Sequence, residues 1–318
     1  SVGLTMVEGI GPVHCRNLVG HIGSAEGVFR ASRKSLRLIP GIGEKLAAVV
    51  SSGSVLRAAE QELKFAEKND VQIIGFEDDR YPWMLKEVHD APYVLYLKGG
   101  LELNNTINVA IVGTRNPSEY GRRLANEFGG YLSEHGINVV SGLAYGIDGA
   151  AHGGALKKGV TTAVLGHGLQ TVYPREHYWQ ANEISNKGAL VTEFNSITGP
   201  DGRNFPMRNR IISGLCHATI VIEAREKGGA LITARSAFEQ NREVYAVPGD
   251  LKRATAKGCN LLIREQVAKL LTDPEQVIDD IAPMLKNELE KVPKQGPPAA
   301  VKMSREEFQV MEALRCNE

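Results

Sequence analysis

The sequence has only four cysteines, and no two of them form a Cys-x-x-Cys pair. Their wide spacing argues against a zinc ribbon and against a secreted disulfide framework. The eight histidines include no His-Glu-x-x-His pattern, so no metal site is predicted. An apolar run long enough to span a membrane is missing, as is a basic start followed by a signal-peptide core. These absences predict a cytoplasmic protein without membrane association.

The net charge of the chain is zero, because 37 Lys and Arg side chains balance 37 Asp and Glu. A protein that binds nucleic acid through bulk positive charge is therefore excluded, and any such site has to be a local basic patch. Hydrophobic residues make up 42% and charged residues 23% of the chain, as is typical of a globular protein. A length of 318 residues suits a main domain with smaller appendages.

An internal repeat lies within residues 1–62, where a Gly-Ile-Gly turn occurs twice between helix-length stretches. This pattern predicts a small all-α tandem helix-hairpin-helix domain of the SAM-like type. The turn glycines tolerate positive φ, and the helix that follows each turn binds a DNA phosphate through its first amides. Seven Lys or Arg against four Glu give residues 1–60 a charge of +3, which favours this role. The predicted contacts to the DNA backbone are Gly9, Gly11, Gly41, Gly43 and Lys45.

Two alternatives to DNA contact stay open for this repeat. It could consist of ordinary helical turns with glycine C-caps. It could also be a module that contacts only protein.

Short apolar runs alternate with helix-length stretches from about residue 107 onward. The runs are rich in β-branched residues and nearly all apolar, as is typical of strands buried on both faces of a parallel sheet. This alternation predicts a doubly wound α/β domain over residues 63–283. An extra pair of strands is predicted in front of it, at Gln72-Ile-Ile-Gly-Phe and Tyr93-Val-Leu-Tyr-Leu. The main runs begin at Val109, Val139, Thr162, Ala189, Thr219 and Val244.

Residues 284–318 are predicted to form a linker and the start of a third domain. The linker contains Lys291-Val-Pro-Lys-Gln-Gly-Pro-Pro. Ser304-Arg-Glu-Glu then begins an amphipathic helix with a capping box. A single helix cannot fold alone, so we expect this domain to be cut short.

Loops at the carboxyl ends of the predicted strands hold the candidate binding residues, because ligands of doubly wound sheets bind at that edge. The loops offer backbone amides and arginines for phosphates, and Phe205 as a stacking surface for an unpaired base. The alternatives are salt bridges at the sheet rim for the arginines and core packing for Phe205. The candidates are Gly113, Thr114, Arg115, Ser141, Gly142, Arg175, Phe205, Arg208, Asn209, Arg210, Gly228 and Gly229.

Catalysis has little support in the sequence. Asp148, Glu193 and Glu223 lie near strand ends and could serve as acid or base. However, no nucleophile elbow of the form Gly-x-Ser-x-Gly occurs. The loop after the first main strand lacks Gly-x-Gly-x-x-Gly, so no dinucleotide or other cofactor is predicted.

A series of motifs over residues 63 to 281 resembles the DprA/Smf (DNA-processing protein A) family. The resemblance implies an extended Rossmann-like fold that binds single-stranded DNA in a strand-end pocket and forms a homodimer. The motifs, in order, are Val109-Ala-Ile-Val-Gly-Thr-Arg, Ser141-Gly-Leu-Ala-Tyr-Gly-Ile-Asp, His152, Thr162-Ala-Val-Leu-Gly-His-Gly, Tyr173-Pro, Phe205-Pro-Met-Arg-Asn-Arg-Ile-Ile, Gly228-Gly-Ala-Leu-Ile-Thr-Ala, Val247-Pro-Gly and Gly258-Cys-Asn-Leu-Leu-Ile.

This resemblance also implies a role. Family members protect incoming DNA during natural transformation and load the RecA recombinase onto it, without base specificity and without catalysis. The motifs carry DNA contact over to Arg115, Arg175, Phe205, Arg208 and Arg210, with Arg203 and Asn260 added. Met207 stands where relatives often have a basic residue. The segment from Ser304 resembles the start of the family's winged-helix domain.

Two other function classes are weighed against this one. The first is a nucleotide phosphoribohydrolase of the lysine-decarboxylase-like superfamily, whose Pro-Gly-Gly-x-Gly-Thr loop corresponds to Lys227-Gly-Gly-Ala-Leu-Ile-Thr here. The missing Gly-Thr ending and the presence of the hairpins disfavour that enzyme. The second is a protein-binding adaptor, in which the basic loops would be incidental.

Overall fold

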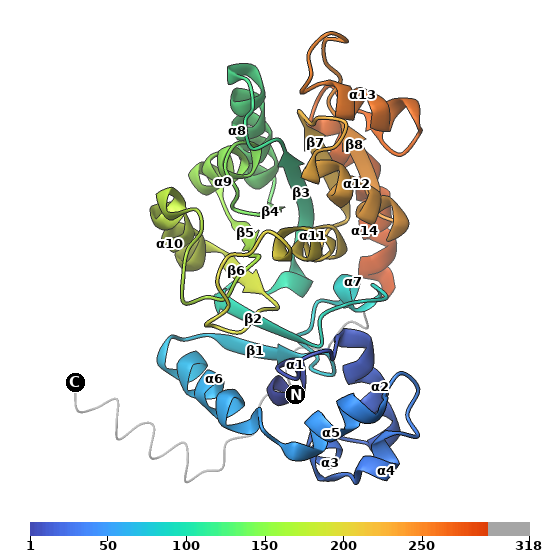
Figure 1. Cartoon of the computed structure of the whole chain (residues 1–318). Helices are drawn as coiled ribbons and strands as arrows, with labels where there is room; N and C mark the ends of the chain where they lie inside the picture. Colours follow the sequence, from blue (N-terminus) through green and yellow to red (C-terminus); the bar gives the residue numbers. More distant parts are fainter. Residues whose placement is uncertain (292–318) are drawn as a thin grey trace, which may run out of the picture. The chain divides into compact units, whose positions relative to one another are not determined.

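The computed structural model of the chain describes residues 1–291, with side chains to residue 283, and is built around one nine-stranded sheet (Figure 1). The strand order is β1-β2-β6-β5-β4-β3-β7-β8-β9. The strands are β1 (Gln72–Gly75), β2 (Val94–Gly99), β3 (Ile107–Gly113), β4 (Ile137–Ser141), β5 (Thr161–Val164), β6 (Ala189–Thr192), β7 (Ala218–Ile222), β8 (Glu243–Ala246) and β9 (Lys269–Leu270).

The pairings from β6 through to β9 in this order are all parallel, whereas β2, near one edge, pairs antiparallel with both β1 and β6. Strands β4, β5, β6 and β7 are buried along their whole length, which explains why they read as continuous apolar runs. The predicted α/β fold, its six main strands and the extra pair before them are confirmed. The short strand β9 was not predicted.

Helices cover both faces of the sheet. From β3 to β6 the strands are added toward one edge, and from β7 onward they are added toward the other. Helices α8, α9 and α10 pack on one face and α11 and α12 on the other. The carboxyl ends of β3 and β7 therefore part at a topological switch point, where doubly wound sheets bind ligands. These helices are α8 (Glu119–Glu134), α9 (Ile147–Lys158), α10 (Tyr178–Lys187), α11 (Asn204–Gly214) and α12 (Gly229–Glu239).

The N-terminal segment folds into the predicted tandem hairpins. Gly9 and Gly41 both have a φ of +84°, a left-handed conformation that favours glycine. Gly11 and Gly43 are the N-caps of the helices that follow the two turns, α2 and α5. The helices of this segment are α1 (Val2–Thr5), α2 (Pro12–Ile22), α3 (Ala25–Arg30), α4 (Arg33–Leu36), α5 (Glu44–Ser52) and α6 (Leu56–Lys68).

The hairpin segment shares a hydrophobic core with the edge strands of the sheet. Its buried side chains form one cluster with Tyr93, Val94 and Tyr96 of the β2 region. The buried carboxylate of Glu62 in α6 accepts hydrogen bonds from the Ser196 amide (2.8 Å) and hydroxyl (2.7 Å). Because α6 continues to Lys68, the predicted boundary between residues 62 and 63 falls inside a helix.

The remaining elements complete the chain to residue 291. They are α7 (Trp83–Lys86), the 3₁₀ turns η1 (Leu103–Asn105) and η2 (Arg175–His177), α13 (Lys257–Arg264) and α14 (Glu275–Lys291). The chain divides into a first unit of residues 1–277, which holds all nine strands, and a second of residues 278–318. Residues 284–291, predicted as linker, are helical. The predicted winged-helix start at Ser304 lies outside the described residues.

Candidate nucleic-acid site

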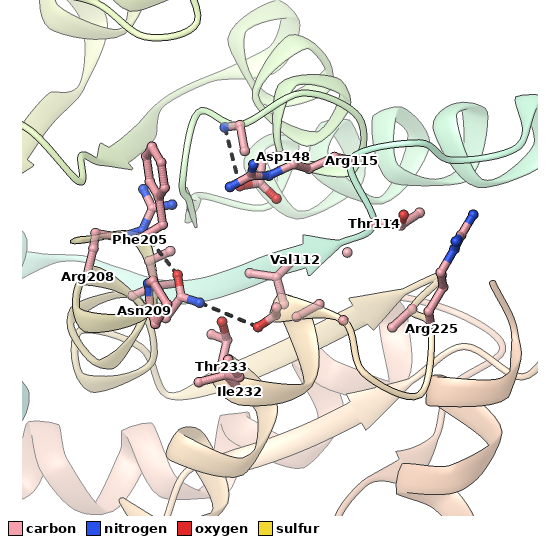
Figure 2. Close-up of a pocket in the computed structure, with 18 of the residues that line it drawn as sticks. Val112, Thr114, Arg115, Asp148, Phe205, Arg208, Asn209, Arg225, Ile232 and Thr233 are labelled. Atoms are coloured by element: carbon pink, nitrogen blue, oxygen red, sulfur yellow. Dashed lines mark hydrogen bonds between the residues drawn. The ribbon is translucent and has the colours of Figure 1, made fainter. Parts of the chain in front are cut away.

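A cavity of about 710 Å³ opens at the switch point between β3 and β7. Its walls come from the loop after β3, the loop after β7 with the first turns of α12, and the segment that leads into α11 (Figure 2). The position is the one predicted from the strand pattern. The residues that line it include Thr114, Arg115, Tyr173, Phe205, Arg208, Asn209, Arg225, Gly228 and Gly229.

Two exposed arginines and one helix N-terminus make the cavity attractive to phosphate. Arg115 follows β3 and Arg225 follows β7, and neither forms an ion pair within the described part of the chain. Gly228 is the N-cap of α12, so the first amides of that helix and the positive end of its dipole face the same cavity. Two guanidinium forks and free amides are the donors that phosphate oxygens prefer.

An aromatic wall stands beside these donors. The rings of Phe205 and Tyr173 stack with centroids 5.7 Å apart and planes 29° from parallel. The Arg115 guanidinium lies 5.2 Å from the centroid of the Phe205 ring, in a cation–π contact. A flat base can therefore stack on this wall while its phosphate meets Arg115.

The floor of the cavity contains two buried ionisable side chains, Arg208 and Asp148. Arg208 is 4% exposed and donates hydrogen bonds to the carbonyls of Gly142 (2.8 Å) and Val164. Burial lowers the pKa of Arg208 to about 10, and the nearby Asp148 opposes that fall. Burial raises the pKa of Asp148, against the opposing effect of Arg208 and the amides of Ala144 and Gly142. Arg208 thus lines the site as predicted, but its buried, bonded guanidinium supports the floor.

Glu223 ties the loop that carries Arg115 to the end of β7. Its side chain is 9% exposed and accepts hydrogen bonds from the Ser118 amide (2.7 Å) and hydroxyl (2.5 Å) at the N-terminus of α8. The Thr114 amide also donates to the Glu223 carbonyl, at 2.7 Å. Glu223 has a φ of +50°, which is unusual for a residue other than glycine and indicates that its surroundings hold it there.

Glu223→Gln is expected to lower the free energy of unfolding by about 1–3 kcal/mol. The two oxygens of the buried Glu223 carboxylate each accept a hydrogen bond from Ser118. In glutamine one of these oxygens becomes an NH₂ group, which cannot accept and therefore faces another donor. Urea denaturation measures the loss, and Glu226→Gln, on an exposed residue of the same loop, is the matched control. Equal stability of the two variants would contradict the anchoring role of Glu223.

Several predicted contacts lie outside the cavity lining. Ser141 is buried, and its hydroxyl donates to the Ile111 carbonyl at 2.6 Å, because β4 and β3 are adjacent strands. Gly142 is buried where a Cβ would lie 2.5 Å from Arg208 Nη2, so this glycine provides space for the floor. Asn260 exchanges hydrogen bonds with the Gly249 backbone at 2.9 and 3.1 Å. The structure gives all three residues structural contacts, and their direct contact with DNA stays a prediction.

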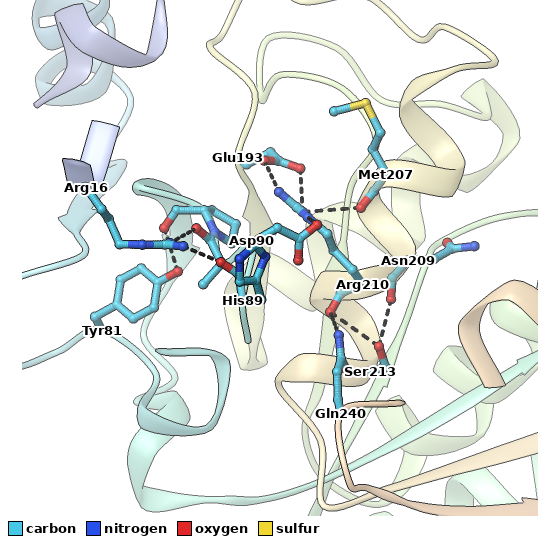
Figure 3. A network of polar contacts seen from close by, with 12 residues as sticks. Arg16, Tyr81, His89, Asp90, Glu193, Met207, Asn209, Arg210, Ser213 and Gln240 are labelled. Carbon is cyan, nitrogen blue, oxygen red and sulfur yellow. Dashed lines mark hydrogen bonds and ion pairs between the residues drawn. The ribbon is translucent and has the colours of Figure 1, made fainter. Parts of the chain in front are cut away.

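Arg210 is held by two carboxylates, and its contact with DNA stays a prediction. Figure 3 shows its guanidinium between Glu193, at 2.7 and 2.8 Å, and Asp90, at 3.0 Å. Its side chain is only 12% exposed, and it lies outside the lining of the switch-point cavity. The alternative considered from the sequence, a salt bridge at the sheet rim, is the one that applies.

Arg203 and Arg175 are exposed but do not line the cavity. Arg203 forms an ion pair with Asp201 at 2.9 Å, and this pair engages its guanidinium group. Arg175 begins the turn η2 beside Tyr173, two residues away from the aromatic wall. Contact between either arginine and DNA stays a prediction.

Sequence reasoning missed Arg225 and the stacking role of Tyr173. Arg225 comes three residues after the end of β7, so the same strand-end argument that selected Arg115 would have found it. Tyr173 was noted only as part of a Tyr-Pro motif. Its contact with Phe205 joins segments far apart in the sequence and has no local signal.

The carboxylates considered as acid or base all have structural partners. Glu223 holds the α8 N-terminus, Glu193 pairs with Arg210, and Asp148 accepts hydrogen bonds from the Gly142 and Ala144 amides. Among the described residues, no group of three or more His, Cys, Asp or Glu side chains is placed to hold a metal ion. None of the described helices combines the length and hydropathy that a membrane span requires.

Comparison with known proteins places this fold and site in a family. The model for "DNA recombination-mediator protein A" matches residues 72–282, and a SAM-like tandem helix-hairpin-helix model matches residues 2–49. Protein Smf of Escherichia coli is 40% identical over 227 residues, which are 71% of this chain and 60% of that relative. The chain thus matches only about 60% of this relative's length.

Two solved structures share the fold. The DNA processing protein A (DprA) of Streptococcus pneumoniae superposes with a TM-score of 0.65 and 32% identity, over 85% of this chain and 98% of that one. The protein of the same name from Helicobacter pylori, described for its single-stranded DNA binding mode, superposes with a TM-score of 0.61 and 27% identity, over 68% and 96%. The chain belongs to the DNA recombination-mediator protein A family, the DprA/Smf family.

Proposed function

We propose that the switch-point cavity binds single-stranded DNA without base specificity. One observation carries this proposal: exposed guanidinium groups, a helix N-terminus and a stacked aromatic pair line the same cavity. The donors suit the phosphates that every nucleotide carries, and the rings suit any base. The cavity is too confined for a duplex, whose bases are already stacked on each other. The Helicobacter pylori neighbour, whose single-stranded DNA binding mode has been described, supports the same ligand.

The biological role proposed for the chain follows from its family. We infer that it protects incoming DNA in natural transformation and loads RecA onto it, as a homodimer in the cytoplasm. The description of the family as recombination mediators supports the RecA step. The structural engagement of Asp148, Glu193 and Glu223 supports a non-catalytic role over a phosphoribohydrolase, which needs a free acid or base.

Single-stranded oligonucleotides are expected to bind more tightly than blunt duplexes of the same length. Fluorescence anisotropy over a series of salt concentrations measures both. The affinity for single strands should fall with rising salt, with a slope in log–log form of about −0.7 per neutralised phosphate. Tighter binding of the duplex, or binding that is indifferent to salt, would contradict the proposal.

We propose that the tandem hairpins add sequence-independent contacts to the DNA backbone. The second hairpin is the better candidate, because Lys45 is exposed beside the Gly43 N-cap. In the first hairpin the Gly11 amide already donates to His14 Nδ1 at 3.4 Å. If Lys45 neutralises one phosphate, Lys45→Ala should make the salt slope shallower by about 0.7. An unchanged slope would contradict the phosphate contact proposed for Lys45.

A further inference from the structure

A group of exposed rings continues from the cavity toward α10. We name Tyr145, His177, Tyr178 and Trp179 the aromatic strip. Tyr145 is 40% exposed, Tyr178 57% and Trp179 76%, although large aromatic side chains usually bury most of their surface. Scattered single apolar residues on a surface need no explanation. Four rings gathered at residue 145 and residues 177–179, however, require an explanation.

The strip is continuous with the aromatic wall of the cavity. Tyr173, whose ring stacks on Phe205, begins the segment that leads through η2 to Trp179. On the other side, Ala144 lines the cavity and precedes Tyr145. The Tyr145 and His177 rings meet edge-on at 5.5 Å, and the Tyr178 and Trp179 rings at 5.9 Å. Both ring pairs thus include residues of one short stretch of chain, residues 173–179, that begins at the aromatic wall of the cavity.

Local hydrogen bonds hold Tyr145 and His177 of the aromatic strip in place. His177 Nδ1 bonds with the Leu143 carbonyl at 2.9 Å. The Tyr145 hydroxyl donates to the Glu176 carboxylate at 2.5 Å. Tyr178 and Trp179 belong to the first turn of α10, whose buried Ala181 and Ile184 fix the helix on the sheet. Rings fixed in this way lose little freedom when a partner stacks on them.

We propose that the aromatic strip is a second base-stacking site, which takes nucleotides of the same single strand as it leaves the cavity. This inference rests on the proposed function of the cavity and extends it to a longer strand. Two features favour a nucleic-acid strand as the partner. The strip follows the aromatic wall of the cavity along the chain, and the exposed Arg175 between them can bind a phosphate.

A protein partner fits the same surface less well. The exposed side chains that follow on α10 are polar, Asn182 and Glu183, so the rings have no apolar surroundings on that helix. The core of a protein–protein interface needs such surroundings and is depleted of charge. Isolated rings in a polar setting suit bases, whose flat faces stack while their phosphates stay in water.

Trp179 provides its own signal for the test. Trp83→Phe leaves Trp179 as the only tryptophan of the chain. Oligothymidylates of increasing length are titrated into this variant while its fluorescence is recorded. We expect the shortest that bind to leave the fluorescence unchanged, and longer ones to quench it. Quenching by every oligonucleotide that binds, or by none, would overturn the proposal.

The double variant Tyr178→Ala with Trp179→Ala tests the contribution to affinity. It should lose at least about fivefold affinity for long oligothymidylates, since stacking on one aromatic ring contributes about 1–3 kcal/mol per base and 1.4 kcal/mol is tenfold in affinity. The ratio of its affinity for long oligothymidylates to its affinity for short ones should fall accordingly. Phe238→Ala removes an equally exposed ring, 53%, from the far end of α12 and is the matched control.

The outcomes separate the two proposals. If the wild-type chain binds no single strand of any length, the proposed function fails and the strip fails with it. If it binds short strands but the double variant keeps the wild-type ratio of long to short affinity, only the strip is overturned. A double variant that loses self-association in sedimentation velocity, with unchanged affinity for long strands, would assign the strip to a second copy of the chain and overturn the proposal.

Discussion

Arg115→Ala is expected to weaken the binding of single-stranded DNA by about 10- to 100-fold. Arg115 is exposed in the cavity and stands 5.2 Å from the Phe205 ring, so it can bind a phosphate while supporting the stacking wall. A charge-assisted hydrogen bond of this kind contributes about 1.5–3 kcal/mol, and each 1.4 kcal/mol is tenfold in affinity. Fluorescence anisotropy with a single-stranded oligonucleotide measures the loss.

Lys157→Ala is the control for this experiment. Lys157 is exposed on α9 and its ammonium contacts only Asn126 Oδ1, at 3.2 Å, so its loss should change affinity little. Arg225→Ala should approach the effect of Arg115→Ala, because Arg225 also lines the cavity. Unchanged affinity in an Arg115→Ala protein with a wild-type far-UV spectrum and melting point would show that the cavity is not the binding site.

Arg208→Met is expected to lower the free energy of unfolding by about 3–5 kcal/mol. Methionine keeps the length of the side chain but leaves the buried Asp148 without its nearby cation, and unpaired buried charges cost this much. It also leaves the Gly142 and Val164 carbonyls without their donor. Urea denaturation measures the difference, which should exceed that of any exposed arginine, such as Arg203→Met.

The pH dependence of this variant identifies the cause. Burial raises the pKa of Asp148, so the folded chain binds a proton there at a pH where the unfolded chain does not. The stability of Arg208→Met should therefore recover relative to the wild type as pH falls toward about 4, the pKa of an unfolded Asp. Adding Asp148→Asn should abolish the recovery. A constant deficit in the single variant would contradict the charge explanation.

The strands of the sheet could be predicted directly from the sequence, whereas the helix boundaries near residue 62 and at residue 291 could not. Runs such as Thr219-Ile-Val-Ile-Glu predict buried parallel strands because burial on both faces excludes polar residues from them. The boundary at residue 62 is less visible, since Leu63 and its neighbours continue an amphipathic helix. Helix α14 runs to Lys291 although Pro283, a residue type that ordinarily ends or kinks a helix, lies inside it.

The arginines show which feature of the site could not be predicted from the sequence, namely the surroundings of each side chain. Arg115, Arg208 and Arg210 read alike in sequence, as cations at strand ends or in a motif. In the structure Arg115 is exposed in the cavity, Arg208 is buried in its floor and Arg210 is paired with Glu193 and Asp90. Glu193 precedes Arg210 by 17 residues and Asp90 by 120, separations at which no local pattern indicates a contact.

The sequence by itself determined the parallel sheet, the two glycine hairpins and the edge at which the cavity lies. These depend on periodicity, glycine conformation and strand direction, which are local properties of the chain. Only the tertiary structure decided which arginine is free, which carboxylates are engaged and that Tyr173 stacks on Phe205. The physical reason is that the availability of a side chain depends on partners brought together by packing, and these partners come from distant parts of the chain.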